Sequence, residues 1–554
     1  MTDSARAVIN AIAEKWSVPG GVVVAVDLRG ETFLHRFGFA DLERGEPVEP
    51  QHLFQIGSIS KVLTSMAVLQ LVEQNMFTLD TPVGAILGWL PAAMRAPDIT
   101  IRRLLNHTGG LVASVDAVPD EIGQATLHSG PPSLAAVGKI FHYSNFGYIL
   151  LGLVVAHVSG TPLPEVVAQR ILQPLGMQDT IACVRHEDYP LLARGYQPLH
   201  DDRPWVPGDP LIPAPWMEVA GADGNLACTA SDLGRFARML LGRGVLDGTR
   251  VLYESTFEAM VSALAPTGED VLDLPGLDPG QSSRYGLGIN VERADNSTLL
   301  THGGGMVGYA SFLLVDLDGG TAVCVVTNAN GDTPVAEAIA RCVAAELSAP
   351  GAVPIDRLDP GAWDADDVQR LGYSGEFVSA TASSPGESVR VAATEQSSGV
   401  VRLSVSAGGQ QAPLLRTWGR RAVTRMPALR RYALVFDANR WIWGPEDLNP
   451  IDAPRDSPAG APTTGSEFCG HYRSYSPWFT NFRVVQRRGA LVLIAPGGVE
   501  APSEDVELVQ VGPATFRIGL DETLPERITF GPLVNGVSAW ADRDGCRYSR
   551  AFTD

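Results

Sequence analysis

The sequence contains very little lysine. Among its 42 lysine and arginine residues only three are lysines, Lys15, Lys61 and Lys139. An arginine side chain stays charged in proteins, whereas a buried lysine amine can lose its proton near neutral pH. A lysine in so arginine-rich a sequence therefore indicates a position where a side chain must accept and return a proton. We single out Lys61, because Ser58 precedes it by three residues and residues three apart share one face of a helix.

An excess of positive charge is also lacking. The formal net charge is −20 and the isoelectric point is near 4.9. This balance argues against nucleic acid or an anionic membrane as a partner, and it mildly favours neutral or cationic ligands. We expect the partner to be a small molecule or a short peptide used as substrate, and the sequence leaves the oligomeric state open.

Paired cysteines are absent as well. The six cysteines show no CxxC spacing, which disfavours a zinc site and a disulfide framework and leaves only a Cys469–Cys546 contact open. No motif for a metal, a nucleotide or a flavin is present, so we expect no cofactor and no metal.

Long apolar runs are missing too. The longest, such as Tyr148 to Val158, is too short to span a bilayer. The first 16 residues have no basic stretch followed by a continuous apolar stretch, and they are typical of an amphipathic helix rather than of a signal peptide. A cytoplasmic location is therefore the expectation.

Residues 20 to 350 alternate strand-like and helical patterns, as in a mixed α/β domain. The predicted strands are 21–27, 312–316 and 322–327, and the predicted helices are 61–74, 145–159, 230–241 and 334–347. Beyond residue 371 the periodic segments are short and strand-like, and Gly, Pro, Asn and Asp interrupt them. We predict a catalytic domain at 1–348, linkers at 349–366 and 451–465, and β-domains at 367–450 and 466–554.

The two predicted β-domains open on similar strings. Tyr373-Ser-Gly-Glu-Phe377 begins the first and Phe468-Cys-Gly-His-Tyr472 begins the second. Each domain, at about 90 residues, is predicted to be a small antiparallel β-barrel or sandwich. Coincidence between two such short strings is the alternative.

Three short motifs carry candidate chemistry. Ser58 stands where a helix N-cap would, and Lys61 follows one turn later. Tyr143 and Asn145 lie two apart before an apolar helix, so both can face one cavity. His302 begins a run of three glycines, 303 to 305, on a predicted strand edge, where a ligand can approach the backbone closely.

In this order the three motifs resemble those of the penicillin-recognising serine enzymes, and the flanking strings are similar to the class C β-lactamase-related branch. Those strings are Phe54-x-Ile-Gly-Ser-x-Ser-Lys61, Leu104-Leu-Asn-His-Thr-Gly-Gly-Leu111, Tyr143-Ser-Asn-x-Gly-Tyr148, Gly221-x-Asp-Gly-Asn-Leu226 and Gly303-Gly-Gly-x-x-Gly-Tyr-Ala-Ser311. The resemblance covers about residues 5 to 348. The two following β-domains are similar to the D-aminopeptidase arrangement. The fold implied is α+β, an antiparallel sheet flanked by helices, followed by two small antiparallel β-barrel or lipocalin-like domains.

The resemblance implies a serine hydrolase mechanism. Ser58 attacks an ester or amide carbonyl, and Lys61 and Tyr143 take its proton and return one to the leaving group, with the primary base left open. Asn145 holds Lys61 or the substrate amide. By motif position the N–H groups of Ser58 and Gly305, beside Gly304, form the oxyanion hole.

The third motif departs from the Lys-Thr-Gly of β-lactamases, whose cation and hydroxyl hold a carboxylate. Here His302 is expected to be a weaker, pH-dependent cation and Gly303 has no hydroxyl. We therefore expect β-lactams with a carboxylate to be poor substrates, and small esters, amides or D-residue-containing peptides to be better ones.

Two alternatives remain. The first is an acyltransferase or peptide-cyclising thioesterase that uses the same acyl-enzyme, and the second is an inactive binding module. In the D-aminopeptidase-like arrangement a loop of the last β-domain reaches the cleft, and we predict that the segment Tyr472–Asn481 does so here. Closure of the barrel is the other explanation for its aromatic residues.

Overall fold

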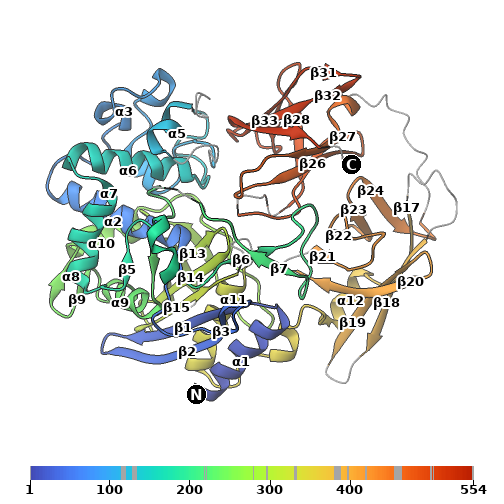
Figure 1. Ribbon diagram of the computed structural model, residues 1–554, viewed down its shortest axis with the longest axis horizontal. Coiled ribbons are helices and arrows are strands. Elements are labelled where there is room, and N and C mark those ends of the chain that lie inside the picture. Colours follow the sequence, from blue (N-terminus) through green and yellow to red (C-terminus); the bar gives the residue numbers. More distant parts are fainter. Residues whose placement is uncertain are drawn as a thin grey trace.

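The structure is a computed structural model with an N-terminal α+β part and two C-terminal β-barrels (Figure 1). It describes residues 2–113, 120–127, 134–217, 219, 221–278, 280–294, 297–329, 334–379, 388–395, 399–417, 421–453, 465–499, 502 and 504–551. This architecture confirms the predicted fold class.

An antiparallel sheet of eight strands forms the centre of the N-terminal part. In spatial order the strands are β11 (Ser282–Tyr285), β12 (Asn290–Ala294), β13 (Ser297–Met306), β14 (Tyr309–Asp316), β15 (Thr321–Thr327), β1 (Gly20–Asp27), β2 (Gly30–Asp41) and β3 (Glu46–Pro47). Strands β1, β14 and β15 are buried along almost their whole length, as strands covered on both faces are.

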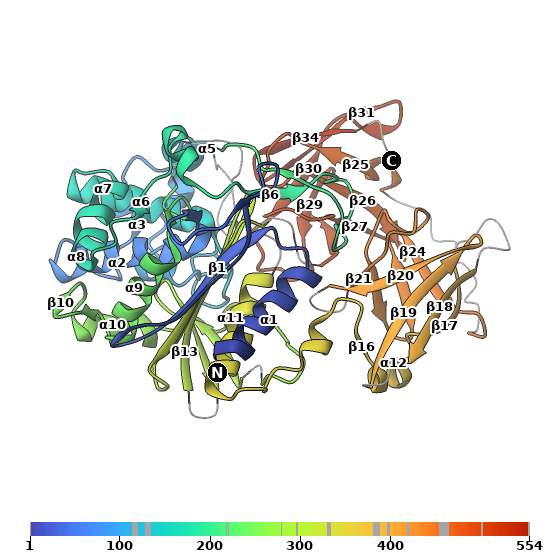
Figure 2. The ribbon, with the colours of Figure 1, turned by 60° about the horizontal axis from the view of Figure 1, so that its bottom comes forward.

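Helices cover both faces of this sheet. Alternate residues of β1 point to opposite sides, so that Val22 and Val24 join one core and Val23 joins the other. Helices α1 (Thr2–Lys15) and α11 (Val335–Ser348) pack together on one face (Figure 2). On the other face lie α2 (Ser60–Glu73), α6 (Asn145–Ser159), α9 (Ala230–Leu241) and α10 (Glu254–Ser262), with the shorter α3 (Val83–Ile86), α4 (Ile101–Leu105), α5 (Glu121–Leu127), α7 (Leu163–Val167) and α8 (Gln173–Leu175).

Eight strands close the first barrel, because β19 pairs with both β18 and β20, and β16 (Trp363–Asp364) adds to it beside helix α12 (Ala365–Leu371). They are β17 (Gly375–Ser379), β18 (Ser388–Glu395), β19 (Val400–Ala407), β20 (Gln410–Arg416), β21 (Arg421–Val423), β22 (Leu434–Asp437), β23 (Arg440–Trp443) and β24 (Glu446–Pro450). Closure leaves few unpaired edges.

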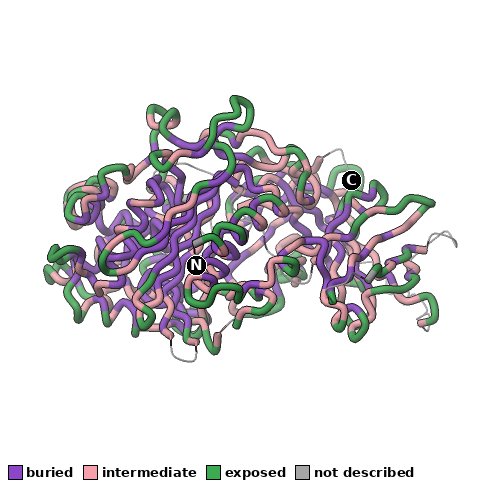
Figure 3. The backbone as a smooth tube through the Cα atoms, turned by 90° about the horizontal axis from the view of Figure 1, so that it is seen from below, coloured by how far each residue is buried: buried purple, intermediate pink, exposed green. Residues whose placement is uncertain are grey.

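The second barrel is also closed by eight strands. They are β25 (Gly470–Arg473), β26 (Asn481–Arg487), β27 (Ala490–Ile494), β28 (Val506–Gln510), β29 (Thr515–Ile518), β30 (Arg527–Phe530), β33 (Trp540–Arg543) and β34 (Cys546–Arg550), and β31 (Leu533–Val534) and β32 (Val537–Ser538) pair only with each other. Cys469 and Cys546 are both free thiols, so no disulfide joins them. In Figure 3, buried backbone is concentrated in the N-terminal part, and the longest unbroken buried run of the described residues is 59–71, along α2.

The hairpin of β6 (Tyr196–Pro198) and β7 (Leu211–Pro213) reaches from the N-terminal part toward both barrels (Figure 1). Its Asp201 accepts two hydrogen bonds from Arg473 of the second barrel, at 2.8 and 2.9 Å. Its Asp209 pairs with Arg425 and Arg430 of the first barrel, at 3.0 and 3.1 Å. A guanidinium that bonds a carboxylate through two nitrogens fixes geometry as well as charge, so the Arg473–Asp201 pair orients the second barrel against the N-terminal part. The two single contacts to Asp209 attach the first barrel to the same hairpin.

In the described part of the chain no single helix is long and apolar enough to cross a membrane. Helix α6 meets the length and composition criteria only together with the segment Leu163–Leu175, to which it is bent by 76°.

Two glycines bring the turn before α2 against strand β13. Gly57 has a φ of +51°, and a Cβ there would lie 2.5 Å from the backbone N and O of Gly305. A Cβ on Gly304 would in turn collide with the Ile56 carbonyl oxygen. The glycine run of β13 therefore admits the protein's own backbone, and this contact places Ser58 at the sheet.

We predict that Gly57→Ala destabilises the protein more than Gly45→Ala. Gly45 has a similar φ of +63°, but nothing lies within 4 Å of a Cβ built on it. Both alanines carry a left-handed backbone penalty of about 1–2 kcal/mol, and only Gly57→Ala adds a backbone clash. The thermal midpoint of the N-terminal part should fall clearly further for Gly57→Ala. Equal midpoints for the two variants would contradict the close contact.

Candidate active site

Ser58 lies in a 3₁₀ turn, Gly57–Ile59, that leads directly into α2. The helix N-cap is Ile59, whose side chain makes no capping bond, so the prediction of Ser58 as N-cap is wrong. The reason is the left-handed Gly57, which turns the chain one residue earlier than a capped helix start would. The Ser58 hydroxyl is therefore not used for capping and faces the pocket described below.

Lys61 is fully buried on the first turn of α2. Its Nζ donates hydrogen bonds to Ser58 Oγ at 2.9 Å and to the Asp223 carbonyl oxygen at 2.8 Å. The segment that carries Asp223 is itself held in place, because Thr64 donates to the Ala222 carbonyl and Glu121 accepts from the Ala222 N–H. The amine is thus fixed on the serine hydroxyl from two sides.

Tyr143 and Asn145 both line the same pocket as Ser58. Ser144 between them turns away and caps α6: its Oγ accepts from Gly147 N at 3.0 Å and donates to the Val112 carbonyl. Tyr143 and Asn145 therefore face one cavity, as their spacing of two residues predicts. Their catalytic roles remain a proposal.

Burial raises the pKa of Tyr143 well above its ordinary value, and the charge of Glu269 adds to this, while the nearby Ser58 hydroxyl acts in the opposite direction. Tyr143 is accordingly a neutral phenol at physiological pH. It can donate or relay a proton, but it does not rest as a phenolate base.

His107 orients Tyr143 from behind. The two rings stack with centroids 4.2 Å apart, and His107 Nδ1 accepts a hydrogen bond from the Ser144 N–H. Burial, with the charge of Lys61, lowers the pKa of His107 well below its ordinary value, so its ring is neutral. The sequence shows His107 within the string Leu104–Leu111, but it does not show this contact.

His302 differs from the expectation of a pH-dependent cation. It is fully buried, its Nε2 shares a 2.7 Å hydrogen bond with the Tyr285 hydroxyl, and it is not among the residues that line the pocket. Burial lowers its pKa to about 3, so the imidazole is neutral and that expectation is wrong. The His302 side chain lies in the core against Tyr285, and the pocket is lined by the three glycines that follow it.

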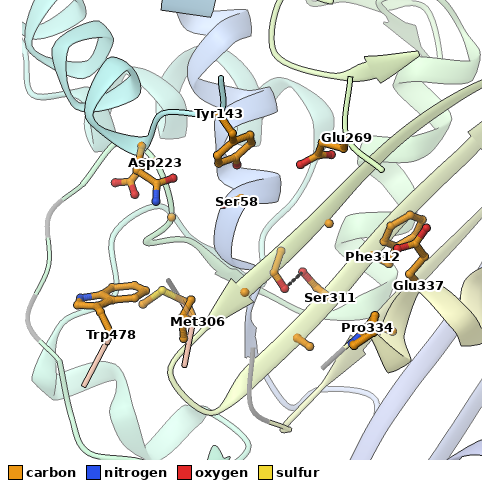
Figure 4. A pocket seen from close by; sticks show the side chains of 18 of the residues that line it. Ser58, Tyr143, Asp223, Glu269, Met306, Ser311, Phe312, Pro334, Glu337 and Trp478 are labelled. Atoms are coloured by element: carbon orange, nitrogen blue, oxygen red, sulfur yellow. Dashed lines mark hydrogen bonds between the residues drawn. The ribbon is translucent and has the colours of Figure 1, made fainter. Parts of the chain in front are cut away.

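The pocket has a volume of about 340 Å³ (Figure 4). Ser58, Tyr143, Asn145, Gly304 and Gly305 come together along it, as the motifs predict for a common site. The structure adds lining residues that were not named as site residues, Asp223, Glu269, Met306, Phe312, Glu337 and Trp478. Asp223 and Met306 lie in the strings Gly221–Leu226 and Gly303–Ser311, and Trp478 lies in the segment predicted to reach the cleft, whereas nothing in the sequence indicated Glu269, Phe312 or Glu337.

The second barrel completes this pocket. Trp478, from the segment predicted to reach the cleft, lines it, whereas Tyr475 of the same segment is 96% exposed. Glu526 also reaches the site from the barrel, and its Oε1 accepts from the Ala113 N–H at 2.9 Å and contacts His142 Nε2 at 2.5 Å. His142 adjoins Tyr143, so the barrel supports the catalytic segment directly.

In the described ranges no group of three or more His, Cys, Asp or Glu side chains has the geometry to hold a metal ion.

Comparison with known proteins gives consistent results. Residues 6–347 match the family model described as Beta-lactamase. Penicillin-binding protein 4 of Amycolatopsis lactamdurans is 30% identical over 334 residues, which cover 58% of this chain and 83% of that protein. D-amino acid amidase from Ochrobactrum anthropi SV3 is 25% identical in a solved structure, with a TM-score of 0.51 over 63% of this chain and 99% of that one.

A larger share of the chain matches the octameric penicillin-binding protein homologue from Pyrococcus abyssi. The match covers 80% of this chain and 99% of that one at 21% identity, with a TM-score of 0.53, and so extends the likeness in fold beyond the N-terminal part. With the family model spanning the sheet, the helices and all the motif residues, the chain belongs to the beta-lactamase family.

Proposed function

We propose that the protein is a serine hydrolase that forms an acyl-enzyme on Ser58 and cleaves small esters, amides or D-residue-containing peptides. The observation that carries this proposal is the 2.9 Å hydrogen bond between the buried Lys61 amine and Ser58 Oγ at the floor of a pocket. The likeness to a D-amino acid amidase supports the substrate class.

In the first step, a bond forms between Ser58 Oγ and the carbonyl carbon, and the bond from that carbon to the leaving group then breaks. Lys61 is placed to take the serine proton directly, in its neutral form. Tyr143, being a neutral phenol, is placed to give a proton to the leaving group and to recover one from Lys61. Water then attacks the acyl-enzyme, gives one proton back through the same groups, and releases the acid.

The backbone N–H groups of Ser58 and Gly305 are the proposed oxyanion hole, with Gly304 beside them. The contact between Gly57 and Gly305 supports this, since it holds the two residues on one wall of the pocket. A preorganised donor of this kind contributes about 3–4 kcal/mol to lowering the barrier. His302 acts as a positioning residue through Tyr285, whose ring also packs on His107.

Asn145 is the proposed holder of Lys61 or of the substrate amide, as it lines the same pocket as Ser58 and Tyr143. Substrates with a free carboxylate are expected to be poor, because His302 is neutral and Asp223, Glu269 and Glu337 line the pocket. Penicillins are therefore expected to be poor substrates on two grounds: the third motif lacks a cation, and the pocket lining adds carboxylates.

Lys61→Arg should abolish turnover of p-nitrophenyl acetate, with a loss of about 10³-fold or more, because a guanidinium keeps its charge but cannot accept the serine proton. The matched control is Lys139→Arg, since Lys139 is exposed. The measurement is kcat/KM for the purified, folded variants. An active Lys61→Arg enzyme would show that Lys61 is only structural.

Trp478 should limit the size of the acyl group. Removing its indole in Trp478→Ala opens the pocket wall, so kcat/KM for p-nitrophenyl hexanoate should rise several-fold relative to that for the acetate. Tyr475→Ala is the control, because this exposed neighbour removes an aromatic ring without touching the pocket. If a folded Trp478→Ala enzyme keeps the wild-type ratio of kcat/KM for hexanoate over acetate, the second barrel does not limit the size of the acyl group.

A further inference from the structure

The charges that line the pocket are all of one sign. Asp223, Glu269 and Glu337 line it, and its described lining includes no Lys, Arg or His. In Figure 4, Glu269 and Glu337 lie toward one end of the pocket, and Trp478 and Met306 lie toward the other. Asp223 lies on the side of Trp478, and Phe312 and Pro334 lie beside Glu337. We call the end that holds Glu269 and Glu337 the acidic end.

The Arg341 guanidinium behind the acidic end already pairs with two carboxylates, those of Glu292 and Glu337. Arg341 donates to both carboxylate oxygens of Glu292, at 2.9 and 2.8 Å, and its Nε donates to Glu337 at 2.7 Å. Glu292 is buried on β12 and also accepts a hydrogen bond from the Thr301 hydroxyl. Two carboxylates thus use the one guanidinium, and Glu269 is left without a share of it.

Glu269 comes from the segment between α10 and β11, and its backbone is fixed. Its N–H donates to Asn290 Oδ1 at 3.2 Å, and its carbonyl accepts from the Ser283 hydroxyl at 2.6 Å. No described residue forms a hydrogen bond or ion pair with its carboxylate, which lines the pocket. A carboxylate that lines a pocket without a partner can take a ligand cation as its partner.

The pKa of Glu269 is raised to about 8, first by burial and then by the charges of Glu337, Glu292 and Asp270, while the charge of Lys61 acts in the opposite direction. The carboxyl is therefore largely protonated at pH 7 in the free protein. A bound cation would favour the ionised form, so binding would release a proton.

Glu269 also lies close to Tyr143, whose pKa its charge helps to raise. In the proposed mechanism Tyr143 gives its proton to the leaving group. The leaving group then occupies the acidic end, and the acyl group occupies the end lined by Trp478 and Met306.

We propose, resting on the function proposed above, that Glu269 selects substrates whose leaving group carries a cation, with an ammonium bound between Glu269 and Glu337. A hydrogen-bonded or closely paired charge in a pocket of this kind is worth about tenfold or more in affinity. The site thus takes a cationic leaving group where Lys-Thr-Gly enzymes hold a carboxylate.

The test compares two thioesters of nearly equal shape, acetylthiocholine and S-(3,3-dimethylbutyl) thioacetate, whose leaving groups differ by one positive charge. For the wild-type enzyme, kcat/KM should be about tenfold or more higher for the cationic ester. Glu269→Gln should lower this cation-to-neutral ratio by about tenfold. Asp273→Asn is the matched control, because Asp273 is an exposed carboxylate of the same segment that neither lines the pocket nor is among the charges that shift the pKa of Glu269, and it should leave the ratio unchanged.

The pH dependence provides a second readout. The quaternary ammonium of the ester keeps its charge at every pH, so a change of the ratio with pH reports ionisation of the protein and not of the substrate. In the wild type the ratio should rise as the pH passes through about 8 and Glu269 ionises, and in Glu269→Gln it should stay flat. Other titratable and charged groups also surround Glu269, but they are present in both the wild type and Glu269→Gln, so they do not explain a difference in pH dependence between the two. They are Glu337, Glu292, Asp270, Lys61 and Tyr143.

Ser58→Ala separates this inference from the proposed function. If Ser58→Ala hydrolyses both esters as fast as the wild type does, the proposed function fails, and binding of choline against 3,3-dimethylbutan-1-ol to the same protein decides the inference. Choline bound about tenfold more tightly supports the inference. A ratio near one for the esters in a Ser58-dependent enzyme, or equal binding of the two alcohols, overturns the inference.

Discussion

The site depends on one close contact between two stretches of backbone. Gly57 lies against Gly305 at a distance that leaves no room for a side chain on Gly57, and the left-handed φ of Gly57 makes the turn possible. This contact sets Ser58 on the edge of the glycine strand. It also directs the start of α2, so that Lys61 points at the serine hydroxyl from inside the protein.

Around this contact, buried groups without charge hold the reacting side chains. Tyr143 is fixed by the stacked His107 ring, and His107 and His302 both have a lowered pKa and are neutral. Neutral imidazoles add no repulsion to the buried Lys61 amine, as imidazolium ions would. The charges of the pocket are carboxylates, and the second barrel adds Trp478 to its wall and Glu526 behind it.

The sequence predicted the local elements well where the apolar period is long. Helices α6 and α9 begin and end at the predicted residues, because each has a capping Ser or Thr and a strong helical pattern. The motifs also predicted that Ser58, Tyr143, Asn145 and Gly305 share a pocket. By contrast, Ser58 proved not to be an N-cap, because a glycine with positive φ cannot be distinguished from an ordinary glycine in one sequence.

The residues that the sequence could not reveal come from distant segments. Glu269 and Glu337 join the site only after the sheet and helix α11 have packed together, and neither lies in a motif. Trp478 differs from them, because it lies in the segment 472–481 that was predicted to reach the cleft. The direction of His302 depends on the register of β13, where a shift of one residue reverses the face. The predicted domain boundaries stay predictions, and most of the predicted linker at 451–465 lies outside the described residues.

The most direct test of the account is covalent labelling of the active serine. A fluorophosphonate should react with the wild-type protein at a single serine, and peptide mapping by mass spectrometry should place the label on Ser58. Ser58→Ala should remain unlabelled, although Ser60 lies two residues away, because Ser60 is buried and its Oγ accepts from Leu226 N. A label on Ser60 or elsewhere, or a labelled Ser58→Ala protein, would contradict the central claim that Ser58 is the nucleophile.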